Sequence, residues 1–162
     1  MPFTWSGRAT QTLSAAAMSA LLLTSAMKHF RDPAFFHPVV PDILCRDDSG
    51  GRPNGPLAVM TRDEWVAFSG LLEAGAAVGL LLPATRKAAA AGVTAMFTVF
   101  VAGHVDALRR AWGPDGTPGQ RKVHTARLPL QVPLILWAWG LRKPTLTRRV
   151  PGPRWRISGP RQ

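Results

Sequence analysis

WVAFSGLLEAGAAVGLLLPAT, residues Trp65 to Thr85, is a run of 21 residues with a single ionisable side chain, Glu73. About 20 consecutive apolar residues are enough for a helix to cross the hydrocarbon core of a bilayer. A charge near the bilayer centre costs at least about 3 kcal/mol, so Glu73 must face protein or water and needs a polar partner. The stretch predicts a membrane-spanning helix, and the other polar residues are candidates for the partner of Glu73.

Three further apolar runs, at residues 9–27, 88–105 and 128–141, surround this stretch. The mean hydropathy of +0.04 is ordinary for a soluble protein, yet the 29 charged residues lie almost entirely between the runs. Such segregation is typical of a membrane bundle with polar loops. We therefore predict an all-α fold, an integral membrane antiparallel four-helix bundle within residues 1–143. Its spans are expected near residues 9–28, 64–83, 87–106 and 123–141.

Two of these spans have alternative interpretations. The first run follows Arg8 and contains Thr24-Ser25-Ala26, so a cleaved signal peptide is an alternative to a retained first span. The last run has only 14 residues, from Leu128 to Leu141, and by length alone it also suits a buried helix of a soluble protein. It becomes a span if its helix starts one turn earlier and takes in Arg127, with Pro129 and Pro133 distorting it.

The connections are also predicted from composition. Prolines at 33, 38 and 41 forbid a long helix after His29, and this segment suits the headgroup region. Thr61 is an expected N-cap because Glu64 follows at the capping-box spacing. The link from Pro83 to Lys87 is short enough to force the next helix to return antiparallel. Residues 106–127 are expected to form a second external loop.

The net charge is +11, and a basic balance alone would also suit nucleic acid. No nucleic-acid motif accompanies it, and the cations sit at the ends of apolar runs, so we expect no nucleic-acid partner. The composition of residues 144–162 predicts a basic, disordered tail that lies near anionic lipids. The acid-free tail and the Arg86-Lys87 turn favour cytoplasmic termini in a multi-pass protein of the bacterial cytoplasmic (inner) membrane.

Cysteine occurs once, at Cys45. A single cysteine excludes an intrachain disulfide, a CxxC redox pair and a cysteine-based metal cage. Quinone-reducing thiol oxidoreductases that need paired cysteines are therefore excluded for this chain acting alone.

The alternating spans predict where polar side chains gather. His29, His104 and Arg127 are expected at the membrane face of the two long connections. Glu73 and Gln131 are expected at similar depth, because a helix rises 1.5 Å per residue. The candidate polar cluster is therefore Glu73, Arg127, Gln131, His29 and His104, with Glu73 paired to Gln131 or Arg127.

Each member of this cluster also has a structural interpretation. Glu73 is either a functional carboxylate or a protonated structural carboxyl that hydrogen-bonds between helices. His29 and His104, at helix ends, suit an interfacial position as well as a ligand role. No pair shows a chelating spacing, so no metal site is predicted. Gly70, Gly75 and Gly79 give the second span small edges against which a neighbouring helix can pack closely.

Three blocks of the sequence resemble the DoxX family of four-helix bacterial membrane proteins: KHFRDPAFFHPVVPDIL, then SGLLEAGAAVGLLLPATRKAA, and finally ARLPLQVPLILWAW. The similarity covers roughly residues 10–143. Where the family has Pro-Ala-Asn in the third span, this chain has Val101-Ala102-Gly103 followed by His104. The family's motif positions correspond to His29, Phe30, Pro33, Pro41, Ser69, Gly70, Glu73, Gly79, Pro83, Arg86, Arg127, Pro129 and Gln131.

Some DoxX members are associated with sulfur-compound oxidation at the quinone pool, or with a membrane oxidoreductase complex that includes superoxide dismutase. The resemblance therefore implies an accessory or quinone-proximal subunit of a membrane redox or thiol-stress complex. It leaves the cofactor open, with a quinone as the candidate, and makes a soluble oxidoreductase a candidate partner beside the lipid bilayer. The alternative is a non-catalytic membrane scaffold or small-molecule-binding protein.

Overall fold

The computed structural model describes residues 7–49 and 55–143, and the described chain is all-helical. The tail predicted at residues 144–162 lies outside this part. The long elements are α1 (Gly7–Arg31), α2 (Arg62–Leu81), α3 (Arg86–Ala111) and α4 (Pro118–Gly140). Three 3₁₀ helices follow α1: η1 (Pro33–Phe35), η2 (His37–Val39) and η3 (Asp42–Leu44).

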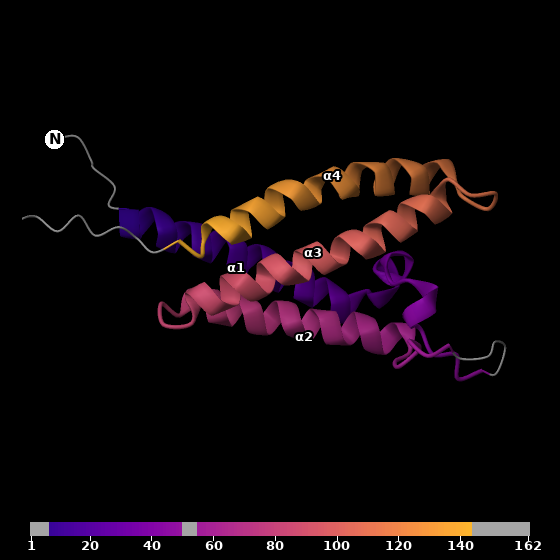
Figure 1. Cartoon of the computed structure of the whole chain (residues 1–162), viewed down its shortest axis with the longest axis horizontal. Coiled ribbons are helices and arrows are strands. Elements are labelled where there is room, and N and C mark those ends of the chain that lie inside the picture. The colour runs from indigo at the N-terminus through magenta and orange to yellow at the C-terminus, as the bar shows by residue number, and fades with distance from the viewer. Residues whose placement is uncertain (1–6, 50–54, 144–162) are drawn as a thin grey trace, which may run out of the picture.

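The helices pack as two pairs (Figure 1). α1 packs along α2, and α3 packs along α4, while the principal contact between the pairs is made by α2 and α3. α1 begins and α4 ends at the same end of the molecule, where the link between α2 and α3 also lies (Figure 1).

The two halves of the molecule along its length are built differently. The half toward the α2–α3 link, here called the apolar half, contains one core cluster to which all four long helices contribute. The members of this cluster are Ala15, Met18, Leu22, Ala77, Leu80, Ala90, Val93, Phe97, Ala138 and Leu141. In the other half, the polar half, the same buried stripes carry His29, Glu73, His124 and Gln131.

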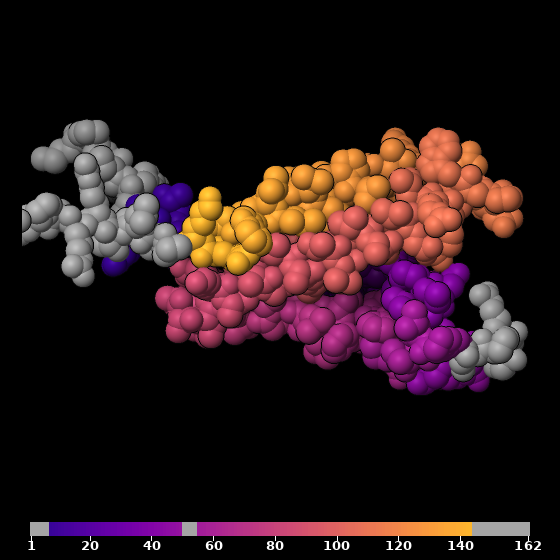
Figure 2. All heavy atoms as spheres, in the orientation of Figure 1, coloured from indigo at the N-terminus to yellow at the C-terminus, as the bar shows by residue number. Residues whose placement is uncertain are grey.

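Residues 32–49 form a compact segment that we call the cap. Its chain turns through η1, η2 and η3 because prolines at 33, 38 and 41 allow only short helical turns. Figure 2 shows the cap packed against the ends of α2 and α3, at the end of the polar half. Gly103 of α3 makes this approach possible, since a Cβ there would lie 2.2 Å from the carbonyl oxygen of Val39.

The capping box predicted at the start of α2 is confirmed, because Thr61 Oγ1 accepts from the Glu64 amide and Glu64 accepts from the Thr61 amide. The long loop predicted at residues 106–127 is wrong. α3 continues to Ala111, with Asp106 and Arg110 paired at 2.9 Å across one turn. α4 begins at Pro118, where Thr117 and Gln120 form a second capping box, so only residues 112–117 lie between the helices.

By length and composition, α2 and α3 are the two described helices able to cross a membrane. Less than a third of each apolar window is buried within the described chain, 28% in α2 and 22% in α3. α4 contains Pro129 and Pro133 and follows a curved path (Figure 1). This curvature agrees with the distortion predicted from the two prolines.

Candidate functional site

The most buried charged group of the polar half is Glu73, which is 3% exposed. Its Oε1 atom lies 3.5 Å from Nε2 of His29, and the His29 side chain is 5% exposed. The second carboxyl oxygen, Oε2, is buried with no hydrogen-bond partner among the described residues. The structure therefore joins an acid and a base from neighbouring helices at a site that solvent hardly reaches.

The proton positions of His29 follow from its other ring nitrogen. Nδ1 lies 2.9 Å from the carbonyl oxygen of Val66 and 3.1 Å from Ser69 Oγ. A carbonyl oxygen only accepts, so Nδ1 carries a hydrogen and donates to Val66. In the neutral ring Nε2 is then unprotonated, and it faces Glu73. The pair can hold one proton between Nε2 and the carboxyl group, in a charge-separated or a neutral form.

Gly70 and Phe36 determine the position of the His29 imidazole. A Cβ on Gly70 would lie 2.9 Å from the Cβ of His29, so glycine at this position lets α1 come close to α2. Phe36 of the cap then stacks on the imidazole, with ring centroids 3.6 Å apart and planes inclined by 17°. The imidazole is thus held between α2 and the cap, with Nε2 directed to Glu73.

A second group of polar side chains lies on α3 and α4. Gln131 is 8% exposed, and its Oε1 atom is buried without a hydrogen-bond partner in the described chain. The Nδ1 atoms of His104 and His124 are also buried and unpartnered there. Arg127 lies close enough to both histidines for its charge to act on them. This group therefore offers several buried polar atoms whose hydrogen bonds are unfilled.

The aromatic residues of the cap connect the two polar groups. The Arg127 guanidinium lies 4.2 Å from the ring centroid of Phe35, and Lys28 lies 4.6 Å from the same centroid. Phe35 and Phe36 contact each other edge to face, with centroids 5.1 Å apart. A continuous series of contacts therefore runs from Arg127 through Phe35 and Phe36 to His29.

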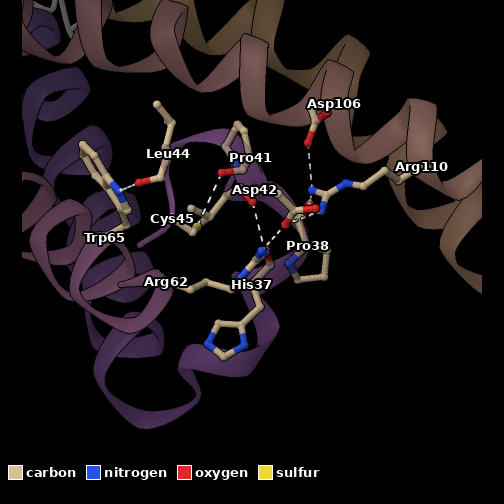
Figure 3. A network of polar contacts seen from close by, with 11 residues as sticks. His37, Pro38, Pro41, Asp42, Leu44, Cys45, Arg62, Trp65, Asp106 and Arg110 are labelled. Carbon is tan, nitrogen blue, oxygen red and sulfur yellow. Dashed lines mark hydrogen bonds and ion pairs between the residues drawn. The ribbon is translucent and has the colours of Figure 1, made fainter. Parts of the chain in front are cut away.

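Two arginines hold the cap in place (Figure 3). Arg62 of α2 donates to the carbonyl oxygens of His37 at 2.6 Å and Val40 at 3.1 Å, and it pairs with Asp42. Arg110 of α3 donates to the carbonyl oxygen of Pro38 at 2.7 Å and lies 3.3 Å from the same carboxylate. The cap is thereby tied to both helix pairs, and its aromatic residues are fixed over the polar half.

Cys45 forms a hydrogen bond within the cap (Figure 3). Its Sγ atom donates to the carbonyl oxygen of Pro41 at 3.4 Å. Burial raises the pKa of the Cys45 thiol, so at neutral pH the group is a protonated thiol and a poor nucleophile. Nearby, the hydrogen bond from Arg46 lowers the pKa of the Asp48 carboxyl.

Among residues 7–49 and 55–143, no three His, Cys, Asp or Glu side chains are grouped to hold a metal ion.

The structure brings His29 and Glu73 together, but it does not join Glu73 to Gln131 or Arg127. Within the described residues Glu73 makes no hydrogen bond or ion pair with either of them. α1 packs along α2, so the imidazole of α1 reaches the carboxylate first, and the Arg127 guanidinium stacks on Phe35 instead. The partner predicted for Glu73 is therefore corrected to His29.

Of the three glycines predicted to mediate helix packing, two lie close to a neighbouring helix and one does not. Gly70 contacts α1 as described above, and a Cβ on Gly79 would lie 2.9 Å from the Cβ of Ala89 in α3. Gly75 has nothing within 4 Å of its Cβ position, so it contacts no other helix in the described chain. Five residues beyond Gly70, it lies about 140° away around a helix of 3.6 residues per turn and is directed outward.

Sequence reasoning missed Phe35, Phe36 and His124 as neighbours of this site. His124 had a usable signal, because it precedes Arg127 by three residues and so shares its helix face. The aromatic pair had none, since its place depends on how the cap folds back between the helix pairs.

Comparison with known proteins identifies a protein family. No curated protein and no solved structure matches the chain. The model of a protein family described as a domain of unknown function, DUF8561, matches residues 18–142. This match spans α1 from Met18 to the end of α4, including the cap and every polar residue described above. The chain belongs to the DUF8561 family.

Proposed function

We propose that this chain is a multi-pass protein of the bacterial cytoplasmic membrane that folds as an antiparallel four-helix bundle. The exposed faces of its helices support insertion, because large apolar side chains cover them. Examples are Leu71 at 62% exposed on α2 and Val99 at 69% on α3. α1 and α4 carry exposed leucines too, Leu13 at 53% and Leu136 at 64%. Patches of this kind in a monomer mark contact with lipid or protein.

Charge supports an orientation with both termini in the cytoplasm. Every Asp and Glu of the chain except Glu73 lies in the cap, at positions 63 and 64, or at positions 106 and 115. The opposite end carries Arg8, Arg86, Lys87, Arg142 and Lys143, with no acid among them. Short basic segments favour the cytoplasmic side of a membrane.

Within this membrane protein we place the functional site in the polar half. The protein itself serves as an accessory, quinone-proximal subunit of a membrane redox or thiol-stress complex. The single observation that carries the role is the buried His29–Glu73 pair, which can hold or release one proton. Reduction and oxidation of a quinone move protons together with electrons, so a buried proton-holding pair suits its neighbourhood. The resemblance to DoxX proteins points to the same chemistry.

The test is binding of a short-chain quinone and its quinol to detergent-purified full chain between pH 5 and pH 9. The proposal expects saturable binding whose affinity changes with pH in the wild type. Glu73→Gln removes the proton-holding carboxyl and should flatten this pH dependence. Asp115→Asn is the matched control, since Asp115 is an exposed carboxylate between α3 and α4. Absence of saturable binding in the wild type would favour the scaffold alternative and contradict this role.

A further inference from the structure

The end of the molecule opposite the cap carries a groove of about 480 Å³ between the first turns of α1 and the last turn of α4. Ser14 and Gln11 line it on α1, and Leu136, Trp137, Gly140 and Lys143 line it on the other side. α1 and α4 belong to different helix pairs, and they meet here rather than along their lengths.

Polar bonds fix the walls of the groove. The Trp137 indole donates to Ser14 Oγ at 2.8 Å, and Gln11 Nε2 donates to the carbonyl oxygen of Lys143 at 2.6 Å. Ser14 accepts in its bond, so its own hydroxyl hydrogen remains to donate to another group. The ammonium group of Lys143 has no acidic partner among the described residues, since none of the acids lies at this end.

The surroundings of the groove have the character of a headgroup layer. Arg142 stacks on Trp139 with its guanidinium carbon 3.8 Å from the ring centroid, and the Nε atom of Arg142 is buried without a partner in the described chain. Aromatic and basic residues together at the end of an apolar helix are typical of a membrane interface. The apolar walls of the groove are complementary to the acyl chain of a lipid. The cations of Arg142 and Lys143 are complementary to a negative headgroup.

We propose that this groove binds one anionic phospholipid, with an acyl chain along Leu136 and Trp137 and the phosphate beside Lys143 and Ser14. The inference rests on the membrane insertion proposed above and assigns a lipid site to the cytoplasmic end. The site lies at the opposite end from the cap, and it contains none of the residues placed around Glu73.

The chain offers a matched pair of variants to test the site. Gly140 lines the groove, and a Cβ built there meets nothing within 4 Å, so a side chain can begin there without a clash, and Gly140→Leu is designed to fill the groove. Gly75 has the same open surroundings on the exposed side of α2, and Gly75→Leu is the control. Lys143→Gln keeps the groove open and removes the cation.

The measurement is retention of phosphatidylglycerol against phosphatidylcholine of identical acyl chains by the full chain in detergent, by native mass spectrometry. We expect wild type and Gly75→Leu to prefer phosphatidylglycerol, and Gly140→Leu to lose about tenfold in affinity, a change of about 1.4 kcal/mol. Lys143→Gln should lose the preference and keep the residual binding of phosphatidylcholine. Equal retention by Gly140→Leu and Gly75→Leu, or wild-type binding without headgroup preference, overturns the site.

Two further arms separate the sources of failure. Inorganic phosphate at millimolar concentration should not displace the lipid, and full displacement would mean a phosphate site and overturn the lipid assignment. Extraction of membranes with alkaline carbonate tests insertion independently. Release of the chain would contradict the proposed function, whereas an embedded chain without lipid preference contradicts only the groove.

Discussion

The apolar half and the polar half are made from the same four helices, yet different forces hold them. In the apolar half, small and aliphatic side chains such as Ala77, Leu80 and Val93 are completely buried, and the helices close on one another. In the polar half, the corresponding stripes carry His29, Glu73 and Gln131, and the cap fills the space between the helix pairs. Packing specifies the first half, while a few polar contacts and two arginines specify the second.

The largest difference between the halves should appear when the buried pair is broken. His29→Ala leaves the Glu73 carboxyl buried without its base, and we expect a loss of about 3 kcal/mol in the free energy of unfolding. His37 and Asp63 form a matched exposed pair at 2.6 Å, and His37→Ala should cost less than about 1 kcal/mol. Denaturant unfolding in detergent measures both, and equal losses would contradict the special status of the buried pair.

Two glycines of α3 compare the halves within one helix. Gly103→Ala places a Cβ against the carbonyl oxygen of Val39, and the resulting shift of the cap should cost about 1–3 kcal/mol. Gly92→Ala meets nothing within 4 Å and should stabilise the helix by up to about 1 kcal/mol. Thermal unfolding of the two variants should move the transition in opposite directions, and a harmless Gly103→Ala would mean that α3 and η2 are not in contact.

A smaller and local effect is expected from the arginines of the cap. Arg62→Gln removes donors from the carbonyl oxygens of His37 and Val40, at about 1 kcal/mol for each lost bond. Hydrogen exchange should become faster in residues 37–44 while α1 and the apolar core keep their protection. Arg31→Gln, at an exposed position, is the control. Uniform loss of protection over the whole chain would show that the cap is not a separate unit.

The smallest effect should come from the apolar half. Ser19 is its buried polar side chain, and its hydroxyl donates to the carbonyl oxygen of Ala77 at 2.8 Å. Ser19→Ala removes one interhelical bond, which in membrane proteins contributes about 0.6 kcal/mol on average. A shift in the unfolding transition as large as that of His29→Ala would show that polar contacts dominate both halves alike.

Helix positions were predictable from the sequence because they follow from apolar runs and capping residues. The four predicted spans overlap α1 to α4, and the Thr61–Glu64 capping box marks the start of α2. The second box at Thr117 and Gln120 was equally visible, and overlooking it made the loop before α4 too long. Polar composition alone does not end a helix when charged residues such as Asp106 and Arg110 pair along it.

The partner of Glu73 could not be predicted in the same way. Depth along a helix follows from residue number, but depth does not say which neighbouring helix lies beside a given face. That choice depends on the contact of Gly70 with His29 and on the path of the cap, both of which join residues far apart in the chain. Local patterns therefore identified the members of the polar half better than their pairing.

The most direct test of the polar half is a double-mutant cycle on the detergent-solubilised protein with His29→Ala, Glu73→Gln and the double variant. Because the two side chains face each other at 3.5 Å, we predict a coupling of about 1 kcal/mol or more between them. A parallel cycle with Glu73→Gln and Arg127→Gln should be additive within about 0.5 kcal/mol. Additivity of His29→Ala and Glu73→Gln together with coupling between Glu73→Gln and Arg127→Gln would contradict the His29–Glu73 pair. The partner of Glu73 would then be Arg127.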